Sequence, residues 1–372
     1  MEVSVRREDL VRGLYLVQGV VERRNTLPIL ANVLIEPANG GIALTATDME
    51  VGLRNTVQAD VKKKGSVTLN ARKLYEIVRE MTADEVVLRS AQAGWVEVLA
   101  GRSRFRIVSL DPKDYPELPL STPAAASATI KVSPAVLRDM IDKTLFSVSS
   151  DETRLNLSGV YLVAGEEGTL RMVATDGHRL AMIERPVTGA KLERSVILPR
   201  KGLVEARRLL DEAESDGDLA MAVTPKDARI AVGNVSFFMR LVDGEFPDYR
   251  QVIPKSTRVE AKVGRDELLS ALRRTSLLAS ERSRGVKLSL EKDKLEISAS
   301  NPDQGEASEE LEARYSGDAL SIGFNARYLL DVLNAHGQGD EITLGLTDEV
   351  GPGIVKGAQD DSYTYVVMPM RL

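Results

Sequence analysis

The chain has 372 residues, of which 43% are hydrophobic and 28% charged, which is enough for two or three globular domains. It has no cysteine and only two widely separated histidines, so we exclude a disulfide scaffold, a thiolate metal site, a cysteine nucleophile and a multi-histidine metal centre. The net charge of −6 argues against uniform coating of nucleic acid, and no apolar run is long enough to span a membrane, so we expect a soluble, cytoplasmic protein.

The first 120 residues predict two helices separated by short strands. A strand at the N-terminus leads into an amphipathic helix over 6–21, and a later strand leads into a helix over 69–80. Between these helices, LANVLIEPANGGIALTATDME alternates apolar and polar residues around Asn-Gly, as an antiparallel hairpin does. Leu74, Ile77 and Val78 follow helical spacing, so one stripe of the second helix packs on a sheet and its other face is polar.

The same order of elements returns twice further along the chain. Strand-to-helix segments place Leu10, Leu137 and Leu268 in register, at spacings of 127 and 131 residues. The repeats predict further helices over 133–146, 198–210, 264–284 and 324–336. We therefore expect an α+β protein of three tandem domains, each with two helices packed on antiparallel sheets, at residues 1–121, 128–252 and 253–372.

Charge is unevenly divided between the predicted elements. The six predicted helices carry 18 basic and 11 acidic residues, a net charge of +7, while the rest of the chain carries −13. This segregation suits a surface that attracts phosphate, although helices commonly present Lys and Arg to solvent. No recognition-helix, zinc-finger or aromatic stacking pattern accompanies the basic residues, so any nucleic acid would be bound through its backbone without sequence readout.

Three similar domains also suggest a closed ring. If neighbouring domains were related by a rotation of about 60°, two chains joined head to tail would complete the circle. Twelve helices, each about 10 Å thick, would then line a bore of about 30 Å. Duplex DNA, about 20 Å across, fits such a bore with room for water. We therefore expect a ring-forming homodimer.

Six segments resemble one protein family. ARKLYEIVRE, VATDGHRLA, PRKG, LVDGEFPDYR, GFNARYLLDVLNA and the terminal YVVMPMRL are similar to segments of the bacterial DNA polymerase III beta subunit, the replicative sliding clamp. The resemblance covers all three repeats at matching spacings. It implies a homodimeric ring that encircles double-stranded DNA without sequence specificity and confers processivity on the polymerase. It implies no catalytic activity, no cofactor and no metal.

The resemblance also implies partners and DNA-contact positions. The partners are the replicative polymerase, clamp-loader subunits, other proteins with a clamp-binding motif, and a second copy of the chain, with no membrane. Arg24 and Arg72 match basic positions that touch DNA in clamps. Lys73, Arg200 and Lys201 are added because they stand at helix starts. Asp151, Leu155 and Asn156 come from the loop that ends at residue 156. The resulting DNA-binding set is Arg24, Arg72, Lys73, Asp151, Leu155, Asn156, Arg200 and Lys201.

A groove that captures short peptides in the family maps onto the second and third repeats. The peptide-binding set is Leu157, Thr175, Gly177, His178, Arg179, Leu180, Pro247, Val252, Val350, Val366, Val367, Met368, Pro369, Met370 and Arg371. Valine, proline and flexible methionine give an apolar concavity that tolerates many ligands, and the two arginines can pair with acidic or carbonyl groups. Gln251 and Gly351–Gly353 depart from some relatives at the rim of this groove, and a terminal edge strand is the alternative interpretation of VVMPMRL.

The dimer contact maps onto four apolar residues. Phe105 and Ile107 near the end of the first repeat, and Leu277 and Leu278 in the third, match positions that join two copies in clamps. Residues of these types are otherwise found in a protein core, and an exposed apolar patch would be a liability without a partner.

Two other classes of function stay open. A carboxylate-dependent hydrolase or phosphotransferase would use Asp48 or Asp176, although Asp-Gly after a strand is most often a turn and the Asp–His pair lacks a nucleophile. A peptide-binding scaffold that never meets DNA is the second alternative. Assay for turnover without partners separates the first from a clamp, and retention on circular DNA separates the second.

Overall fold

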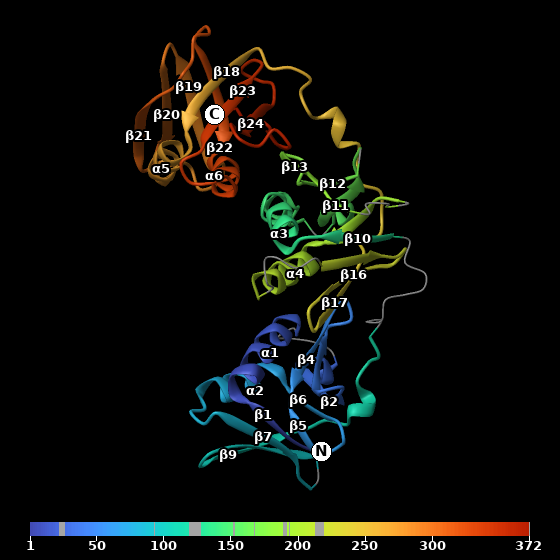
Figure 1. The fold of residues 1–372 in the computed structure, drawn as a ribbon. Coiled ribbons are helices and arrows are strands. Elements are labelled where there is room, and N and C mark those ends of the chain that lie inside the picture. Colours follow the sequence, from blue (N-terminus) through green and yellow to red (C-terminus); the bar gives the residue numbers. More distant parts are fainter. Residues whose placement is uncertain are drawn as a thin grey trace. The chain divides into compact units, whose positions relative to one another are not determined.

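The computed structural model describes residues 1–21, 27–92, 94–118, 128–151, 153–166, 168–188, 192, 194–212 and 219–371. The chain forms two compact units. Unit 1 comprises Met1–Leu137, Val187–Glu193 and Lys201–Leu241, and unit 2 comprises Arg138–Pro186, Arg194–Arg200 and Val242–Leu372. Figure 1 follows the elements in chain order.

All six predicted helices form, two in each repeat. They are α1 (Arg7–Val20), α2 (Ala71–Glu80), α3 (Pro134–Asp142), α4 (Arg200–Glu212), α5 (Arg265–Thr275) and α6 (Ala326–Ala335). In the described part of the chain, six short 3₁₀ turns accompany them: η1 (Pro28–Ala31), η2 (Pro112–Asp114), η3 (Leu145–Ser147), η4 (Leu155–Leu157), η5 (Tyr249–Gln251) and η6 (Ser276–Leu278). Asparagine side chains cap the N-termini of α2 and α6, by accepting from the backbone N–H of Lys73 and of Arg327.

Two helices end earlier than their apolar spacing predicts. The helix predicted over 133–146 ends at Asp142, and the one predicted over 264–284 ends at Thr275. Near each end a threonine hydroxyl bonds back to the preceding turn, from Thr144 to the Met140 carbonyl at 2.7 Å and from Thr275 to the Ala271 carbonyl at 2.9 Å. Such bonds compete with continuation of the helix, and a 3₁₀ turn follows each of them.

Because these two helices end early, the helices carry less net positive charge than the sequence predicts. Within the observed bounds the six helices carry 14 basic and 12 acidic residues, so their surplus is +2 rather than +7. Much of the basic surplus therefore lies in the turns at the helix ends, among them Lys143, Arg282 and Arg284, and not on the helical faces.

Unit 1 contains a five-stranded and an eight-stranded antiparallel sheet. The five-stranded sheet has the order β5-β1-β7-β8-β9, with β1 (Glu2–Arg6), β5 (Asp60–Lys63), β7 (Glu85–Ser90), β8 (Trp95–Ala100) and β9 (Ser103–Val108). The eight-stranded sheet has the order β10-β15-β16-β17-β4-β3-β2-β6, with β2 (Asn32–Ala38), β3 (Gly41–Thr47), β4 (Val51–Gln58), β6 (Val67–Asn70), β10 (Ala128–Val132), β15 (Leu219–Val223), β16 (Asp227–Val232) and β17 (Val235–Arg240). Helix α1 packs on β3 and β4, and α2 lies beside it (Figure 1).

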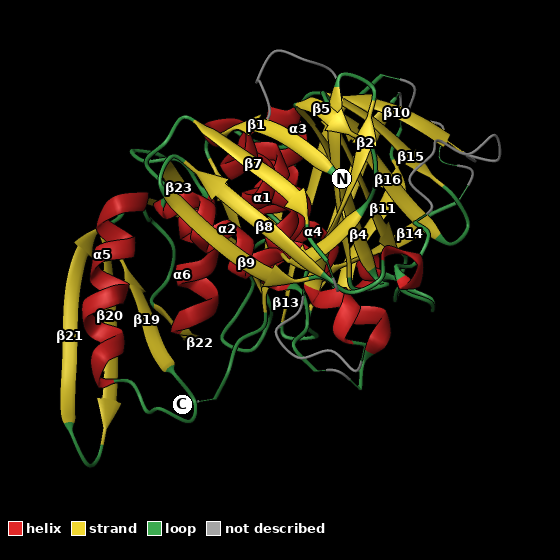
Figure 2. Cartoon of the chain, turned by 90° about the horizontal axis from the view of Figure 1, so that it is seen from below, coloured by secondary structure: helices red, strands yellow, loops and turns green. Residues whose placement is uncertain are grey.

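Unit 2 contains a second pair of antiparallel sheets. Its eight-stranded sheet has the order β14-β11-β12-β13-β25-β24-β23-β18, with β11 (Gly159–Ala164), β12 (Thr169–Thr175), β13 (Arg179–Pro186), β14 (Val196–Pro199), β18 (Val259–Gly264), β23 (Glu341–Leu346), β24 (Gly353–Gly357) and β25 (Tyr363–Val367). The four-stranded sheet has the order β21-β20-β19-β22, with β19 (Gly285–Glu291), β20 (Lys294–Asn301), β21 (Gly305–Glu312) and β22 (Leu320–Asn325). Helix α5 packs over β20 and β21, and β21 is one of the two edge strands of this sheet (Figure 2).

The repeats are joined by strand pairing across each eight-stranded sheet. In unit 1, β4 of the first repeat pairs with β17 of the second, which we call the first seam. In unit 2, β13 of the second repeat pairs with β25 of the third, from Arg179 opposite Val367 to Ile183 opposite Tyr363, which we call the second seam. Each seam therefore has a continuous backbone hydrogen-bond ladder and lies within one unit.

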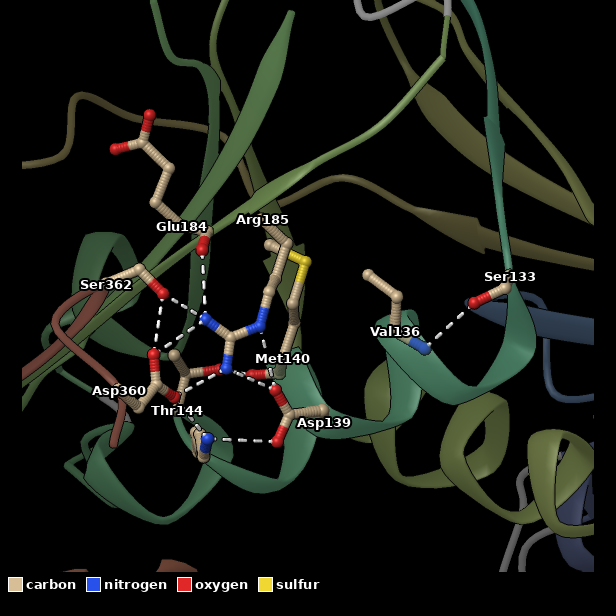
Figure 3. Close-up of polar contacts among 10 residues, drawn as sticks. Ser133, Val136, Asp139, Met140, Thr144, Glu184, Arg185, Asp360 and Ser362 are labelled. Carbon is tan, nitrogen blue, oxygen red and sulfur yellow. Dashed lines mark hydrogen bonds and ion pairs between the residues drawn. The ribbon is translucent and has the colours of Figure 1, made fainter. Parts of the chain in front are cut away.

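An ion network fastens one end of the second seam (Figure 3). The guanidinium of Arg185 on β13 lies 2.6 Å from a carboxylate oxygen of Asp139 on α3 and 2.6 Å from one of Asp360 before β25. Lys143 joins the same two carboxylates, at 3.1 Å and 2.6 Å. Burial alone would raise the pKa of Asp360, but its hydrogen bonds to Arg185 and Lys143 hold that pKa well below its usual value. The network thus ties the second repeat to the third.

Candidate functional site

The turn between β12 and β13 forms one wall of the candidate peptide site, by which we mean the fifteen residues of the predicted peptide-binding set. The Thr175 hydroxyl donates to the Arg179 carbonyl at 2.6 Å, and one carboxylate oxygen of Asp176 accepts from the backbone N–H groups of His178 and Arg179. Gly177 has φ +91°, a conformation that favours glycine. The sequence TDGHR therefore forms a closed turn that leaves His178 exposed.

Arg179 is almost fully buried and is used inside the protein. Its guanidinium lies 3.0 Å from Asp176 and 2.6 Å from Asp331 of α6, and it donates to the Phe146 carbonyl at 2.6 Å. It also stacks over the ring of Tyr328, 4.5 Å from the centroid. Burial alone would lower its pKa, but the neighbouring acidic groups raise that pKa above its ordinary value, so the side chain stays charged. Arg179 therefore positions the turn, while Arg371 is exposed.

The floor beneath this turn is an apolar cluster built across the second seam. Val173 and Leu180 from the second repeat pack with Val366 from the third and with Tyr249 of η5, and all four are buried. Tyr161 and Phe246 flank the cluster with stacked rings, 4.8 Å apart at their centroids. Strand pairing between β13 and β25 holds the two halves of the floor together.

The other residues of the predicted peptide-binding set differ in exposure. Leu157 and Val367 are buried, and Met368, Pro369 and Met370 are half-buried. Pro247, Val252 and Val350 are exposed, Val350 to 72%. The backbone N–H of Met368 donates to the His178 carbonyl at 2.8 Å, so the chain end is attached to the 175–180 turn. The structure brings these residues into one unit, with both the apolar floor and exposed apolar side chains that a peptide could cover.

The predicted DNA-binding residues occupy less uniform surroundings. Arg24 lies outside the described residues. Lys73 pairs with Glu76 at 2.6 Å in the first turn of α2, beside Arg72, and Lys201 pairs with the buried Asp48. The described members of the DNA-binding set are divided between the two units, with Arg72, Lys73 and Lys201 in unit 1 and Asp151, Leu155, Asn156 and Arg200 in unit 2.

In unit 2 the loop that ends at residue 156 is held by its own polar groups. Asp151 accepts from the backbone and hydroxyl of Thr153, and Asn156 donates to the Glu245 carbonyl at 3.1 Å. Leu155 is 63% exposed, and Arg200 is exposed. Of this set in unit 2, Asp151, Leu155 and Arg200 are exposed, and Asn156 is half-buried.

The four predicted dimer residues are on exposed edges and not in a core. Phe105 and Ile107 lie on β9, the last strand of its sheet, where Phe105 is 40% exposed. They line a cleft of about 810 Å³ with the exposed Trp95. Leu277 in η6 is 77% exposed, and its neighbour Leu278 is half-buried. Apolar side chains of this size at a sheet edge and a turn are typical of a surface that another chain covers.

The two aspartates considered for catalysis serve as turn caps. Asp48 accepts from the backbone N–H groups of Glu50 and Val51, as Asp176 does in the equivalent turn of the second repeat. Within the described ranges, no cluster of three His, Asp or Glu side chains could hold a metal ion. No helix in the described part of the chain has the length and apolar character to cross a membrane.

The predicted peptide-binding set contains two of the four floor residues, Leu180 and Val366, and it lacks the other two and the partners of Arg179. Tyr161, Val173 and Tyr249 belong to no predicted set, although Phe246 and Tyr249 stand in the quoted segment LVDGEFPDYR. Asp331 lies 152 residues from Arg179 and carries no local signal. The alternation of β12 could have indicated which of its residues face inward, but not which segment covers them.

The comparisons with known proteins cover the whole chain. Family models of the DNA polymerase III beta subunit match at residues 1–119 for its N-terminal domain, 131–248 for its central domain and 250–371 for its C-terminal domain. The beta sliding clamps of Pseudomonas aeruginosa and of Escherichia coli strain K12 are 39% and 38% identical, each over 100% of both chains. Among solved structures, the sliding clamp of Bartonella birtlesii bound to griselimycin has a TM-score of 0.93 at 37% identity, over 100% of both chains. The beta subunit of Thermotoga maritima has a TM-score of 0.91 at 29% identity, over 100% of this chain and 99% of the other.

Proposed function

Because the chain belongs to the DNA polymerase III beta subunit family, we propose that two copies close head to tail around duplex DNA and recruit other proteins through the candidate peptide site. As a sliding clamp the protein is a non-catalytic processivity factor of the replicative polymerase. We place it in the cytoplasm, where bacterial DNA is replicated. The observation that carries the proposal is the buried floor of Val173, Leu180, Tyr249 and Val366, which is built across the second seam in the unit that also exposes Val252 and Val350.

A short peptide suits this surface for physical reasons. The floor is rigid because it is built on two paired strands, while Met368 and Met370 at its border can adapt to different ligands. Exposed apolar side chains at Val252 and Val350 provide area that a peptide would remove from water, at roughly 25 cal/mol per Å². The relative from Bartonella birtlesii was solved with griselimycin bound.

The ring proposal follows from two free sheet edges. Strand β9 in unit 1 and strand β21 in unit 2 each end a sheet, so each has unpaired backbone groups on its outer side. Arg104 and Arg106 lie on β9, while β21 carries Glu306, Glu309, Glu310 and Glu312. Antiparallel pairing of β9 from one copy with β21 from the next would satisfy both edges and oppose unlike charges. Phe105 and Leu277 would supply the apolar contact.

Retention on DNA then depends on topology more than on phosphate contacts. The observed helices have a small basic surplus, and Lys73 and Lys201 are engaged in ion pairs, so we expect weak and mobile contacts. A closed ring leaves DNA only when one of its interfaces opens. Weak contacts are suited to sliding because they do not fix the ring at one place.

A peptide-binding assay tests whether the apolar floor is part of the peptide site. A labelled peptide that contains the clamp-binding segment of the replicative polymerase should bind the full-length protein, and Leu180→Asp or Val366→Asp should abolish binding. Because both residues are buried, the more exposed Met370→Asp is included, with Leu155→Asp as a control outside the floor. Unchanged affinity in Met370→Asp, with the variant folded, would contradict the assignment of this surface.

A further inference from the structure

A charged cleft of about 490 Å³ lies in unit 2 beside the candidate peptide site. Its walls are residues 148–151 with Arg154, the turn 176–179, the segment 281–284 that follows η6, and the start of α6. The volume falls within the range of about 300–1,000 Å³ that is typical of ligand clefts. A cleft of this size can hold a few residues of an extended chain, whereas a DNA duplex is too wide to enter it.

Arginine dominates the lining of this cleft. Among the described residues, six arginines and three carboxylates line it, and two of these carboxylates are already engaged, Asp151 with Arg154 and Asp176 with Arg179. The side chains of Arg282, Arg284 and Arg327 are exposed and make no ion pair within the described residues. We call this feature the arginine cleft; its lining is Arg154, Arg179, Arg200, Arg282, Arg284 and Arg327 with Asp151, Asp176, Glu281 and neighbouring polar residues.

The start of α6 adds to the positive potential. Asn325 caps this ten-residue helix, and its side chain accepts from the backbone N–H of Arg327 at 3.0 Å. The N-terminal end of a helix carries a partial positive charge, so it favours a negative group in the same place as the free guanidinium groups. Two independent features, the unpaired arginines and the helix end, therefore favour the same kind of ligand.

The arginine cleft is continuous with the candidate peptide site. His178 and Arg179 belong to the turn that walls both, and the His178 ring is stacked with the ring of Tyr328, 6.5 Å away between centroids. On its other side, the His178 carbonyl accepts from the backbone of Met368. A chain that lies on the candidate peptide site and extends past His178 would thus enter the arginine cleft.

We propose that the arginine cleft binds acidic residues that flank the clamp-binding motif of partner proteins. The proposal rests on the proposed function, since it requires a peptide on the neighbouring site. Carboxylates fit guanidinium groups in a bidentate geometry, so a flanking Asp or Glu gains charge-assisted hydrogen bonds there. An acidic peptide is favoured over a nucleic acid backbone because the cleft shares the turn 176–179 with the candidate peptide site.

The test compares two flanks on the same polymerase-derived peptide. One version carries three aspartates next to the motif and the other three asparagines, each placed at either end in turn. We expect the aspartate version to bind the full-length protein about fivefold more tightly at low salt, since exposed ion pairs each contribute modestly. The advantage should shrink towards zero in 0.5 M salt, where the Debye length falls to roughly 4 Å.

The double variant Arg282→Glu with Arg327→Glu should lose this preference while it binds the asparagine version with unchanged affinity. The matched control, Lys287→Glu with Lys292→Glu, changes the charge equally at exposed residues of the same unit and should retain the preference. A preference that persists in the arginine variant, or is absent from the parent, overturns the proposal. Loss of DNA retention with the preference intact would assign these arginines to DNA instead. If neither peptide binds the parent, the peptide site itself is refuted and the cleft proposal falls with it.

Discussion

The substitution Leu277→Asp tests the proposed contact between two copies at an exposed position. Leu277 is 77% exposed, so the change removes little packing inside the chain. Full burial of a leucine side chain is worth about 2 kcal/mol, and burial of the exposed three quarters therefore contributes about 1.5 kcal/mol at each interface. A ring of two chains has two equivalent interfaces, so the dimer loses about 3 kcal/mol, and an unpaired buried carboxylate adds to this loss.

A loss of about 3 kcal/mol raises the dimer dissociation constant roughly 150-fold. Light scattering at several protein concentrations measures this directly, and the variant should be a monomer where the parent is a dimer. Val350→Asp serves as the matched control because that side chain is 72% exposed but belongs to the candidate peptide site. If Leu277→Asp remained dimeric at the same concentrations as the parent, the proposed interface would be wrong.

Three further predictions concern stability and the peptide site. Burial and nearby Lys143 lower the pKa of His336 to about 4, so the unfolded state binds more protons than the folded state between pH 4 and 6.5. The free energy of unfolding should therefore fall by about 3 kcal/mol as the pH drops through this window. Denaturant titrations at several pH values should show a smaller fall for His336→Gln than for the parent. Arg185→Gln leaves Lys143 as the one cation between Asp139 and Asp360 in this network and should cost about 2 kcal/mol in the free energy of unfolding. Arg250→Gln, at an exposed pair, should cost less than about 0.5 kcal/mol. Gly177→Ala forces a side chain into a left-handed backbone conformation and should cost about 1 kcal/mol and weaken peptide binding severalfold in a fluorescence titration; equal affinity would show that this turn does not shape the site.

Local patterns in the sequence were sufficient to predict the helices and the repeats. The spacing of Leu74, Ile77 and Val78 marks the buried stripe of α2, and Asn70 before it caps the helix as its residue type favours. The prediction for α5 was too long because Leu277 and Leu278 continue the apolar spacing after the helix has ended. A threonine hydroxyl that bonds back to the preceding turn decides that end, and apolar spacing does not report it.

The candidate site was predictable only in part, because much of it is non-local. The residues of the TDGHR turn and of the chain end came from the family resemblance, and the structure brings them together through the β13–β25 pairing. Sequence periodicity does not specify which strands pair across almost 190 residues, so the second seam could not be foreseen. The burial of Arg179 follows from Asp331 and the Phe146 carbonyl, and neither is near it in the sequence.

The domain boundaries at 1–121, 128–252 and 253–372 stay a prediction. The seams join the repeats by continuous sheets, and the two compact units each combine parts of two repeats. The family-model matches begin and end near the predicted boundaries, at 1–119, 131–248 and 250–371.

The most direct test of the account is retention on loaded DNA before and after linearisation. The protein is placed on nicked circular DNA by a clamp loader, free protein is removed, and the amount that stays bound is measured before and after one cut by a restriction enzyme. Topological retention predicts stable binding to the circle and rapid loss from the linear ends. Equal retention on both forms would show that phosphate contacts hold the protein, which contradicts closure of a ring around DNA.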